Sequence, residues 1–590
     1  SSNVVELPKT LAELKLLHYL NLSRTKIKWL PNELCSLLNL QTLKLLDCPW
    51  LLGLPKGLSR LINLRHLEIE EAFWKYRCPR QPPNIGRLTS LHNLHKFCVG
   101  EAKKGFGIEE LKDMKCLEGS LHIMELNKAE RAAEANLKNK PRVQVLELEW
   151  ASETKREISQ LKGKTPDEHD AEVLEDLEPH SSLTKLRVHR YCGKRTPSWL
   201  SRGKLQLLKT LILEGCQNLE TLMLGRQENL EVICIKNMKK LRELPAQLEC
   251  PLLHTLKIIN CPDLIQLPQS IPKLRILKVK KCNSLKAIPS LSAIYSGTLV
   301  LVDNPVLEGF PGNYSVDFRD LGARIWRCMI TNCPKIHGLP AKYYNSCRAS
   351  MNRKLEIGEC ESIYFDPSEP LTQLAIDRCR SHTLLEAMNI ISEYKFGITS
   401  DSVVSLHYLQ SLSISNISDL ISFPTKWEVQ ITSLYISACK DLEDLFDSEQ
   451  SCKGSLPRLV NLCIRDCPKL SNFPEEGLPP KLELLVIQSC IRLESLGPPD
   501  TLKDLTSLAD VCIVDCPKLQ SFPAQGFPSS LQHLRIRDSP LLTEKVSKNE
   551  KGRGPDWPKI MNIPYLEIDE VRPSPAPVFA SCSQSLTCFK

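Results

Sequence analysis

Apolar residues return along most of the chain in a fixed pattern, with polar residues between them. The stretch "IINCPDLIQLP" (258–268) carries part of one unit, and "CIRDCPKLSNFP" (463–474) and "CIVDCPKLQSFP" (512–523) repeat it with changed polar residues. Aligned on the cysteine, the template is L-x-L-x-x-C-x-x-L-x-x-L-P, and one unit fills it with Leu256, Ile258, Cys261, Leu264, Leu267 and Pro268. The template position moves 22 residues from Cys216 to Met238 and 23 from Met238 to Cys261. Self-similarity at a period of about 22 residues indicates a solenoid.

The L-x-L step of each unit predicts a short β-strand. A period of two sends both apolar side chains to one face and the residue between them to the other. One unit buries about five apolar side chains, worth roughly 8–15 kcal/mol, whereas ordering about 22 residues of backbone costs about 1–2 kcal/mol each, so a unit folds only when it is stacked on others. The sequence therefore predicts an α/β solenoid: a leucine-rich-repeat horseshoe with a parallel β-sheet on its concave face and mostly irregular or short helical segments on its convex side.

The cysteine of the template marks a position with its own chemistry. Eleven of the 25 cysteines occupy it: Cys48, Cys216, Cys261, Cys282, Cys333, Cys360, Cys379, Cys439, Cys467, Cys490 and Cys516. A free thiol is small and only a weak hydrogen-bond donor, so it fits a tight slot where the chain leaves the strand. We therefore expect a buried column of reduced thiols; disulfides and bound metal are the alternatives.

The register of the repeat divides the chain into five regions. Residues 1–100 are predicted to be N-terminal repeats that begin in mid-unit, and residues 101–180 an irregular or helical insertion with a charged loop at 151–180. The rest comprises the main repeat array at 181–545, a C-terminal cap with a last strand at 546–570 and a disordered tail at 571–590. Within the insertion, "KAERAAEANLKNK" (128–140) and "AEVLEDL" (171–177) predict two helices.

Composition and motifs exclude several classes of function. The net charge is only +8 over 590 residues and 6% of the residues are aromatic, which gives no support to a nucleic-acid surface. No run of 18 apolar residues predicts a membrane helix, and the start "SSNVVELPKT" has neither a signal-peptide pattern nor a methionine, so we expect a fragment. No complete phosphate-loop, zinc-hydrolase or serine-hydrolase motif occurs, so we assign no catalytic, cofactor-binding or metal-binding residue and expect no enzyme.

Two groups of residues are candidates for partner binding. Three successive units carry lysines at the positions expected to face outward: Lys236, Lys257, Lys278, Lys280 and Lys281. Positive charge gathered on one concave face would attract an acidic partner; a solvated face without a partner is the alternative. The second group is aromatic, Phe73, Trp74 and Tyr76, and its side chains either contact a partner or pack against the flank of the array.

Three blocks of sequence resemble plant disease-resistance proteins of the coiled-coil, nucleotide-binding, leucine-rich-repeat class. They are "LHYLNLSRTKIKWLPNEL" (17–34) with the repeats that follow it to 69, "AEVLEDLEPHSSLTKLRVHRYCGKRTPSWL" (171–200) and "GPDWPKIMNIPYLEID" (554–569). The resemblance implies a repeat region that restrains a nucleotide-binding domain in cis and senses a pathogen effector or a guarded host protein. It also implies a cytoplasmic protein, found in the nucleus or at the plasma membrane as well, that acts in innate immunity and the hypersensitive response.

The same resemblance places ADP or ATP on an upstream domain that this sequence lacks, so we expect no cofactor on this chain. We expect neither a nucleic-acid partner nor stable insertion into a membrane. Two other functions remain open. The first is a substrate-binding adaptor of an F-box ubiquitin ligase, although those repeats lack the recurrent L-P ending. The second is an extracellular receptor ectodomain, although the chain shows no paired-cysteine caps and its thiols suit a reducing compartment.

Overall fold

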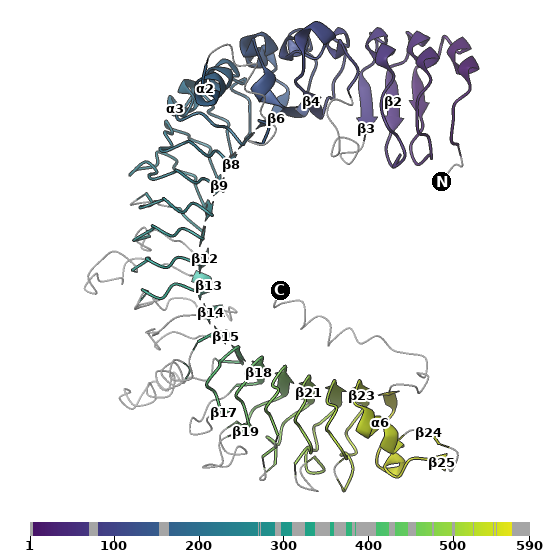
Figure 1. Cartoon of the computed structure of the whole chain (residues 1–590), viewed down its shortest axis with the longest axis vertical. Coiled ribbons are helices and arrows are strands. Elements are labelled where there is room, and N and C mark those ends of the chain that lie inside the picture. The colour runs from purple at the N-terminus through teal and green to yellow at the C-terminus, as the bar shows by residue number, and fades with distance from the viewer. Residues whose placement is uncertain are drawn as a thin grey trace, which may run out of the picture. The chain divides into compact units, whose positions relative to one another are not determined.

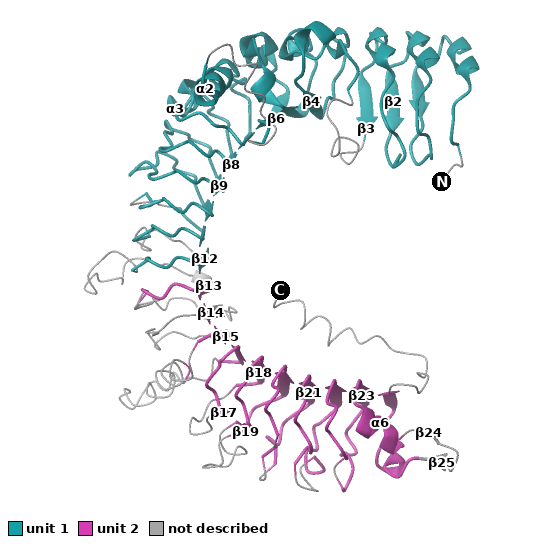
Figure 2. Ribbon diagram, viewed as in Figure 1, with its two compact units in different colours: residues 1–324 teal, residues 325–590 magenta. Residues whose placement is uncertain are grey.

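The computed structural model has the leucine-rich-repeat architecture predicted from the sequence (Figure 1). The residues that it describes are 4–69, 81–152, 164–268, 271, 273–288, 297–308, 325–336, 354–358, 373–379, 384, 409–423, 431–446, 456–471, 473–474, 477–497, 502–522, 524–546, 548–549 and 552–568. The chain divides into two compact units, residues 1–324 and 325–590, which are described separately (Figure 2).

Unit 1 is built from parallel strands contributed by successive repeats. One sheet contains β1 (Tyr19–Asn21), β2 (Thr42–Leu45) and β3 (His66–Ile69). A longer run, in which each strand pairs in parallel with the next, contains β4 (Lys96–Cys98), β5 (Gly119–Met124), β6 (Val143–Glu149), β7 (Lys185–His189), β8 (Thr210–Glu214), β9 (Val232–Lys236), β10 (Thr255–Ile259), β11 (Ile276–Lys280) and β12 (Gly297–Val302). Because the pairing keeps register, equal positions of neighbouring repeats lie side by side.

Unit 2 continues the same pattern. Its parallel strands are β13 (Ile325–Thr331), β14 (Lys354–Gly358), β15 (Gln373–Asp377), β16 (Ser411–Ser415), β18 (Ser433–Ser437), β20 (Asn461–Arg465), β21 (Leu484–Gln488), β22 (Asp510–Val514), β23 (His533–Arg537) and β26 (Tyr565–Ile568). Two small pairs lie outside this sheet, β17 (Ser422–Phe423) with β19 (Asp444–Phe446) and β24 (Lys548–Asn549) with β25 (Gly552–Arg553). Strand β26, which pairs with β23, is the last strand predicted from "YLEID".

Burial along the strands follows the template. Leu256 and Ile258 of β10 and Leu264 of the turn after it are fully buried, each 0% exposed. In β7, β8 and β11 the second and fourth residues are buried, whereas the first, third and fifth are partly exposed. The apolar rungs therefore make the core and the intervening residues make the outer surface of the sheet, as predicted.

A left-handed residue ends most strands. Asn260, Lys281 and Ser489, each directly after its strand, have φ of 57°, 55° and 53°. The N–H of Asn260 donates to the carbonyl of Lys280 at 2.7 Å, and the N–H of Lys281 donates to the carbonyl of Val302 at 2.9 Å. This turn therefore extends the backbone ladder by one residue before the chain bends inward.

The cysteine slot comes next, and its thiols are free and buried as predicted, apart from Cys360, which lies outside the described residues. The slot side chains form a ladder of hydrogen bonds between repeats. The Cys282 thiol donates to the carbonyl of Lys280, 3.5 Å away, and the backbone N–H of Cys282 donates to Oδ1 of Asn304 at 3.1 Å. Asn304 fills the same slot one repeat later and donates to the carbonyl of Val302 at 3.1 Å. The column is thus held by buried backbone groups rather than by disulfides.

The segments between strands are mostly irregular or single turns of 3₁₀-helix. The described turns are η1 (Lys9–Glu13), η2 (Asn32–Ser36), η3 (Lys56–Arg60), η4 (Ile85–Arg87), η5 (Ala102–Lys104), η6 (Ile108–Leu111), η7 (Leu126–Lys128), η8 (Ala132–Ala135), η9 (Leu137–Asn139) and η15 (Trp557–Lys559). The α-helices are α2 (Pro166–Asp176), α3 (Ser198–Ser201) and α6 (Pro540–Val546). Within the described ranges, none of the helices combines the length and apolarity needed to cross a bilayer.

The helix predicted over 128–140 is wrong. This segment forms η7, η8 and η9, and Asn136 between the last two turns has a φ of 52°. Ala132, Ala135 and Leu137 are at most 5% exposed, because they stack on neighbouring repeats, and β5 and β6 on either side stay in the sheet. Packing against the array overrides the helical propensity of the alanines.

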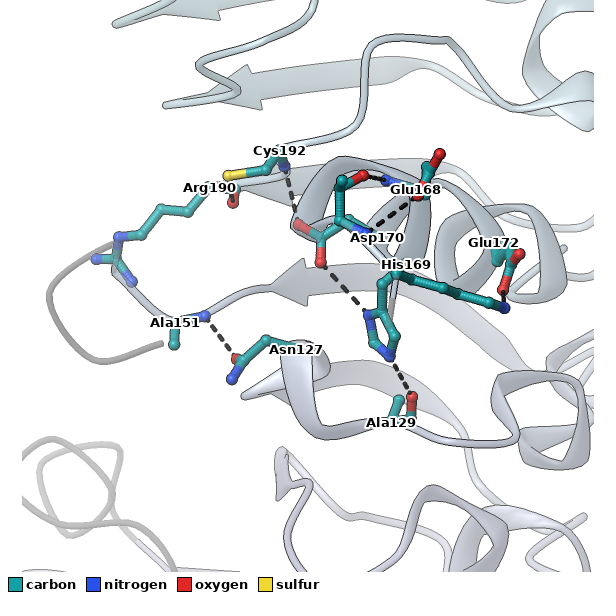
Figure 3. Close-up of polar contacts among 11 residues, drawn as sticks. Asn127, Ala129, Ala151, Glu168, His169, Asp170, Glu172, Arg190 and Cys192 are labelled. Carbon is teal, nitrogen blue, oxygen red and sulfur yellow. Dashed lines mark hydrogen bonds and ion pairs between the residues drawn. The ribbon is translucent and has the colours of Figure 1, made fainter. Parts of the chain in front are cut away.

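The second predicted helix is confirmed as α2. Thr165 and Glu168 form a capping box at its start. His169 places Nε2 3.0 Å from the carbonyl oxygen of Ala129, and the buried Asp170 carboxylate accepts a hydrogen bond from the N–H of Cys192 at 3.0 Å (Figure 3). Contacts to two different repeats therefore anchor α2. Residues 153–163 of the predicted charged loop and the predicted tail at 571–590 lie outside the described residues.

Candidate functional site: the lysine row

The outward face of the sheet in unit 1 is the candidate site, and four of the five predicted lysines lie on it. Lys236 is the last residue of β9, Lys257 is the centre of β10, and Lys278 and Lys280 are the third and fifth residues of β11. All four are partly exposed, while their neighbours in the strand are buried. We call these four residues the lysine row.

Lys281 does not occupy the strand position predicted for it, and its role in partner binding stays a prediction. Lys281 follows the end of β11 and adopts a φ of 55°, so it belongs to the left-handed turn rather than to the strand. The sequence pattern K-V-K-K did not distinguish the last strand residue from the turn residue, because both are lysine.

The register of the strands brings the lysine row together. Lys257 lies directly opposite Lys278, and Lys280 lies opposite Ile259, which in turn lies opposite Lys236. Neighbouring strands are about 4.8 Å apart, so Lys236 and Lys280 are separated by about 10 Å of sheet at the backbone. Figure 1 labels β8, β9 and β12 along this run of strands, and β10 and β11 lie between β9 and β12.

The aromatic group Phe73, Trp74 and Tyr76 falls between β3 and β4, in residues 70–80, which lie outside the described residues. Its role in partner binding stays a prediction.

Sequence reasoning missed an ionic network on the strands just before the lysine row. His122 on β5 places Nε2 2.8 Å from a carboxylate oxygen of Glu149 on β6, and Glu149 also bonds Arg190. Next to them, Arg187 on β7 is 3.2 Å from Glu147. The middle residues of successive L-x-L steps alternate in charge here, so reading those positions across repeats could have found the network.

The electrostatics of this network are dominated by Glu149. Burial alone would raise the pKa of Glu149, but His122 and Arg190 outweigh it and hold the pKa at about 2. On β7, burial lowers the pKa of His189 although Glu214 stands 3.7 Å away. Charges on β5–β8 are therefore matched to one another.

Unit 2 has polar outward positions of a different kind. Asp377 at the end of β15 accepts hydrogen bonds from Ser415 at 2.6 Å and Asn416 at 2.8 Å, and it contacts Arg378 at 3.0 Å. Arg535 on β23 is 2.6 Å from Glu567 on β26. Within the ranges that the structure describes, no cluster of three or more His, Cys, Asp or Glu could hold a metal ion.

Comparison with known proteins shows what this repeat array is similar to. Residues 108–238 match the model of the R13L1/DRL21 leucine-rich repeats. A disease resistance protein of Arabidopsis thaliana is 26% identical over 606 residues, which covers 86% of this chain and 41% of that protein. The chain is therefore similar to plant disease resistance proteins over most of its length.

Further relatives of this chain have names of the same kind. Disease resistance protein RGA1 of Solanum bulbocastanum is 36% identical over 140 residues, which covers 23% of this chain and 13% of that protein. The RPP13-like protein 1 of Arabidopsis thaliana is 29% identical over 421 residues, covering 64% of this chain and 37% of that protein. The chain thus spans less than half the length of each of these three relatives.

Proposed function

We propose that this chain is the recognition and autoinhibitory region of an intracellular plant immune receptor. In this proposal it binds a pathogen effector or a guarded host protein and restrains a nucleotide-binding domain in cis. The observation that carries the proposal is the similarity to a disease resistance protein over 86% of the chain. The relatives named above are disease resistance proteins, which favours this function over a ubiquitin-ligase adaptor or an extracellular receptor.

The fold supports recognition because different residues of each strand form the core and the outer surface. Inward residues such as Leu256 and Ile258 pack in the core, whereas the outward residues of neighbouring strands lie about 4.8 Å apart on a continuous surface. A surface held by so many buried rungs moves little when a partner binds, so its side chains are arranged before contact.

Removal of the repeat region from the complete receptor tests the proposal. The truncated receptor is expected to cause cell death without a pathogen if the repeats restrain it, and to lose its response to the pathogen if the repeats sense it. Ion leakage from leaf tissue measures both, with protein accumulation checked by immunoblot. Expression of the repeat region as a separate chain should restore the restraint, which provides the control. A truncated receptor that behaves like the complete one in both respects would contradict the proposal.

A further inference from the structure

The lysine row gathers four ammonium groups on three neighbouring strands. Like charges directly opposite on neighbouring strands destabilise a sheet, and Lys257 and Lys278 occupy such a pair. Among the described residues, no carboxylate lies within 4.0 Å of the ammonium groups of Lys236, Lys257 or Lys280. A bound anion would therefore give Lys257 and Lys280 the ion pair that the described residues do not provide.

On other strands of unit 1, charged residues pair with residues of opposite charge. Lys44 on β2 is 3.1 Å from Glu68 on β3, and Arg187 on β7 is 3.2 Å from Glu147 on β6. These pairs join neighbouring strands, which is the arrangement that stabilises a sheet. The excess of cations is therefore a property of β9–β11 rather than of the whole sheet.

The strands on the two sides of the lysine row, β8 and β12, carry different kinds of outward residue. On one side, Glu214 of β8 lies opposite Lys236 and is approached by His189 at 3.7 Å. On the other side, Val300 and Val302 of β12 lie opposite Lys278 and Lys280. A ligand that crosses the strands from β9 to β12 therefore meets cations first and aliphatic side chains next.

We propose that the lysine row binds an acidic, extended segment of a partner protein, with carboxylates over β9–β11 and an aliphatic side chain over Val302. This inference rests on the proposed function and names the kind of partner. From β10 to β12 is about 10 Å, and an extended chain covers about 3.3 Å per residue with alternate side chains on opposite faces, so the acidic and aliphatic side chains that face the sheet are two or four residues apart. A sequence that repeats Glu-Ser-Glu-Ser-Val-Ser satisfies this spacing.

The chemistry of the row favours a protein over a nucleic acid. Single-stranded nucleic acids bind on aromatic or arginine platforms that stack the bases. The outward residues of β9–β12 include neither: Val232, Cys234, Lys236, Thr255, Lys257, Ile259, Ile276, Lys278, Lys280, Thr298, Val300 and Val302. A free polyphosphate has no apolar group that could contact Val300 or Val302, so it would bind to the lysines alone.

A peptide-binding measurement on the full chain tests the inference. The probe is a fluorescent dodecapeptide that repeats Glu-Ser-Glu-Ser-Val-Ser, followed by anisotropy at low and moderate salt. The Lys257→Glu, Lys278→Glu, Lys280→Glu variant replaces three attractive charges with three that repel the glutamates of the peptide, so it is expected to weaken binding at least tenfold. Binding should also fall when salt is raised, because exposed charges are screened.

Matched controls separate the lysine row from general charge. The Lys239→Glu, Lys240→Glu, Lys286→Glu variant makes the same change in net charge at exposed residues outside the strands, and it should bind within threefold of the unaltered chain. The Val302→Ser variant should bind the valine-containing peptide severalfold more weakly. It should bind a peptide with serine in place of valine as tightly as the unaltered chain does. Circular dichroism and thermal unfolding establish that each variant is folded, and the milder Lys257→Ala, Lys278→Ala variant replaces the triple one if that fails to fold.

Three outcomes would overturn the inference: equal losses in the matched control, no binding of the peptide, and competition by inositol hexakisphosphate or polyuridylate that is stronger than competition by unlabelled peptide. The last outcome would assign the row to a polyphosphate or to RNA. Because the measurement needs no receptor activity, its failure leaves the proposed function standing. Conversely, a receptor whose resting activity does not depend on the repeats can still bind the peptide.

Discussion

At the scale of single residues, the left-handed position after each strand makes the strictest backbone demand. Asn, Asp, Lys, Arg, Ser and Ala all occur there with φ between 49° and 60°, for example at Arg378 and Arg24. The sequence pattern located the cysteine that follows but not this position, because no residue type marks it. Only the backbone conformation shows that such different side chains serve the same turn.

Replacement of Ala438 by glycine is therefore expected to stabilise the protein. Ala438 has a φ of 52°, and a left-handed conformation costs a non-glycine residue about 1–2 kcal/mol, which exceeds the entropic cost of glycine of about 0.5–1 kcal/mol. We expect a gain of about 0.5–1 kcal/mol in the free energy of unfolding, measured by chemical denaturation. The matched Ala375→Gly change at the centre of β15 should destabilise by a similar amount; a loss in both variants would refute this account of the turn.

The ionic network predicts a specific response to acid. The pKa of Glu149 is held near 2 in the folded chain, below the 4.5 of a free glutamate, so its contribution to stability is present above pH 4.5 and disappears as the pH falls toward 2. Glu149→Gln should lower the free energy of unfolding by about 1 kcal/mol at pH 7, after allowance for solvent screening.

The difference between the Glu149→Gln variant and the unaltered chain should shrink between pH 4.5 and 2, as followed by urea denaturation at each pH. The exposed Glu249→Gln change provides the control, whose small effect should not vary with pH in this way. A constant difference across that window would show that the carboxylate charge of Glu149 is not what stabilises the fold.

At the scale of the repeat element, the sequence predicted the template of apolar positions but not the hydrogen bonds between cysteine-slot residues of neighbouring repeats. The spacing of apolar residues correctly predicted the strands, their inward rungs and buried reduced thiols. It did not predict that slot residues bond backbone groups of neighbouring repeats, because such bonds depend on the stacking distance between units. The predicted helix over 128–140 failed for the same reason, since stacking of Ala132 and Ala135 decided its form.

Cys490 tests the ladder. Burial raises the pKa of the Cys490 thiol, a hydrogen bond with the backbone of Cys467 opposes this, and the thiol donates to the carbonyl of Gln488 at 3.5 Å. Cys490→Val removes these hydrogen bonds and adds a methyl group to a buried slot, so the free energy of unfolding should fall by about 1–3 kcal/mol. Cys490→Asn should change it by less than about 1 kcal/mol, because Asn304 occupies an equivalent slot while fully buried. Equal effects of the two substitutions would mean that the slot is filled by packing alone.

Thiol accessibility gives a second test of the column. Burial raises the pKa of Cys467 to about 12 and that of Cys516 to about 11, so few thiolates form at pH 8. Among the described cysteines, the half-buried Cys116 and Cys512 should be alkylated first, and the slot cysteines should react only after denaturation. Peptide mapping by mass spectrometry after brief iodoacetamide treatment measures the order. Stoichiometric disulfides, or early labelling of Cys467, would contradict a reduced and buried column.

At the scale of the whole molecule, each of the two units is a stack of repeats in which a repeat contacts chiefly its neighbours in sequence. The repeat period predicted this architecture and placed the lysine row on one face. It did not predict the division into units at residues 324 and 325, because apolar spacing continues on both sides of it. Nor did it predict the matched charges on β5–β8, since the outward positions follow no template.

A local change should therefore have a local effect. Cys490→Val lies in unit 2, whereas β6, β7 and β8 lie in unit 1. We expect the variant to increase hydrogen exchange around β20, β21 and β22 and to leave hydrogen exchange in β6, β7 and β8 unchanged. A parallel rise in both regions would show that the two units unfold as one cooperative block.

The alternation of inward and outward residues has a consequence for how such a chain can change. Inward residues pack in the core, whereas outward residues form the surface that a partner can contact. A single substitution at Lys257 or Lys278 therefore changes the surface of the sheet without changing the core. Insertion of one residue into β10 would exchange the two sets and send Leu256 or Ile258 toward water. Point mutations at outward positions can therefore change which partner the surface binds, whereas a one-residue insertion within a strand would disrupt the core.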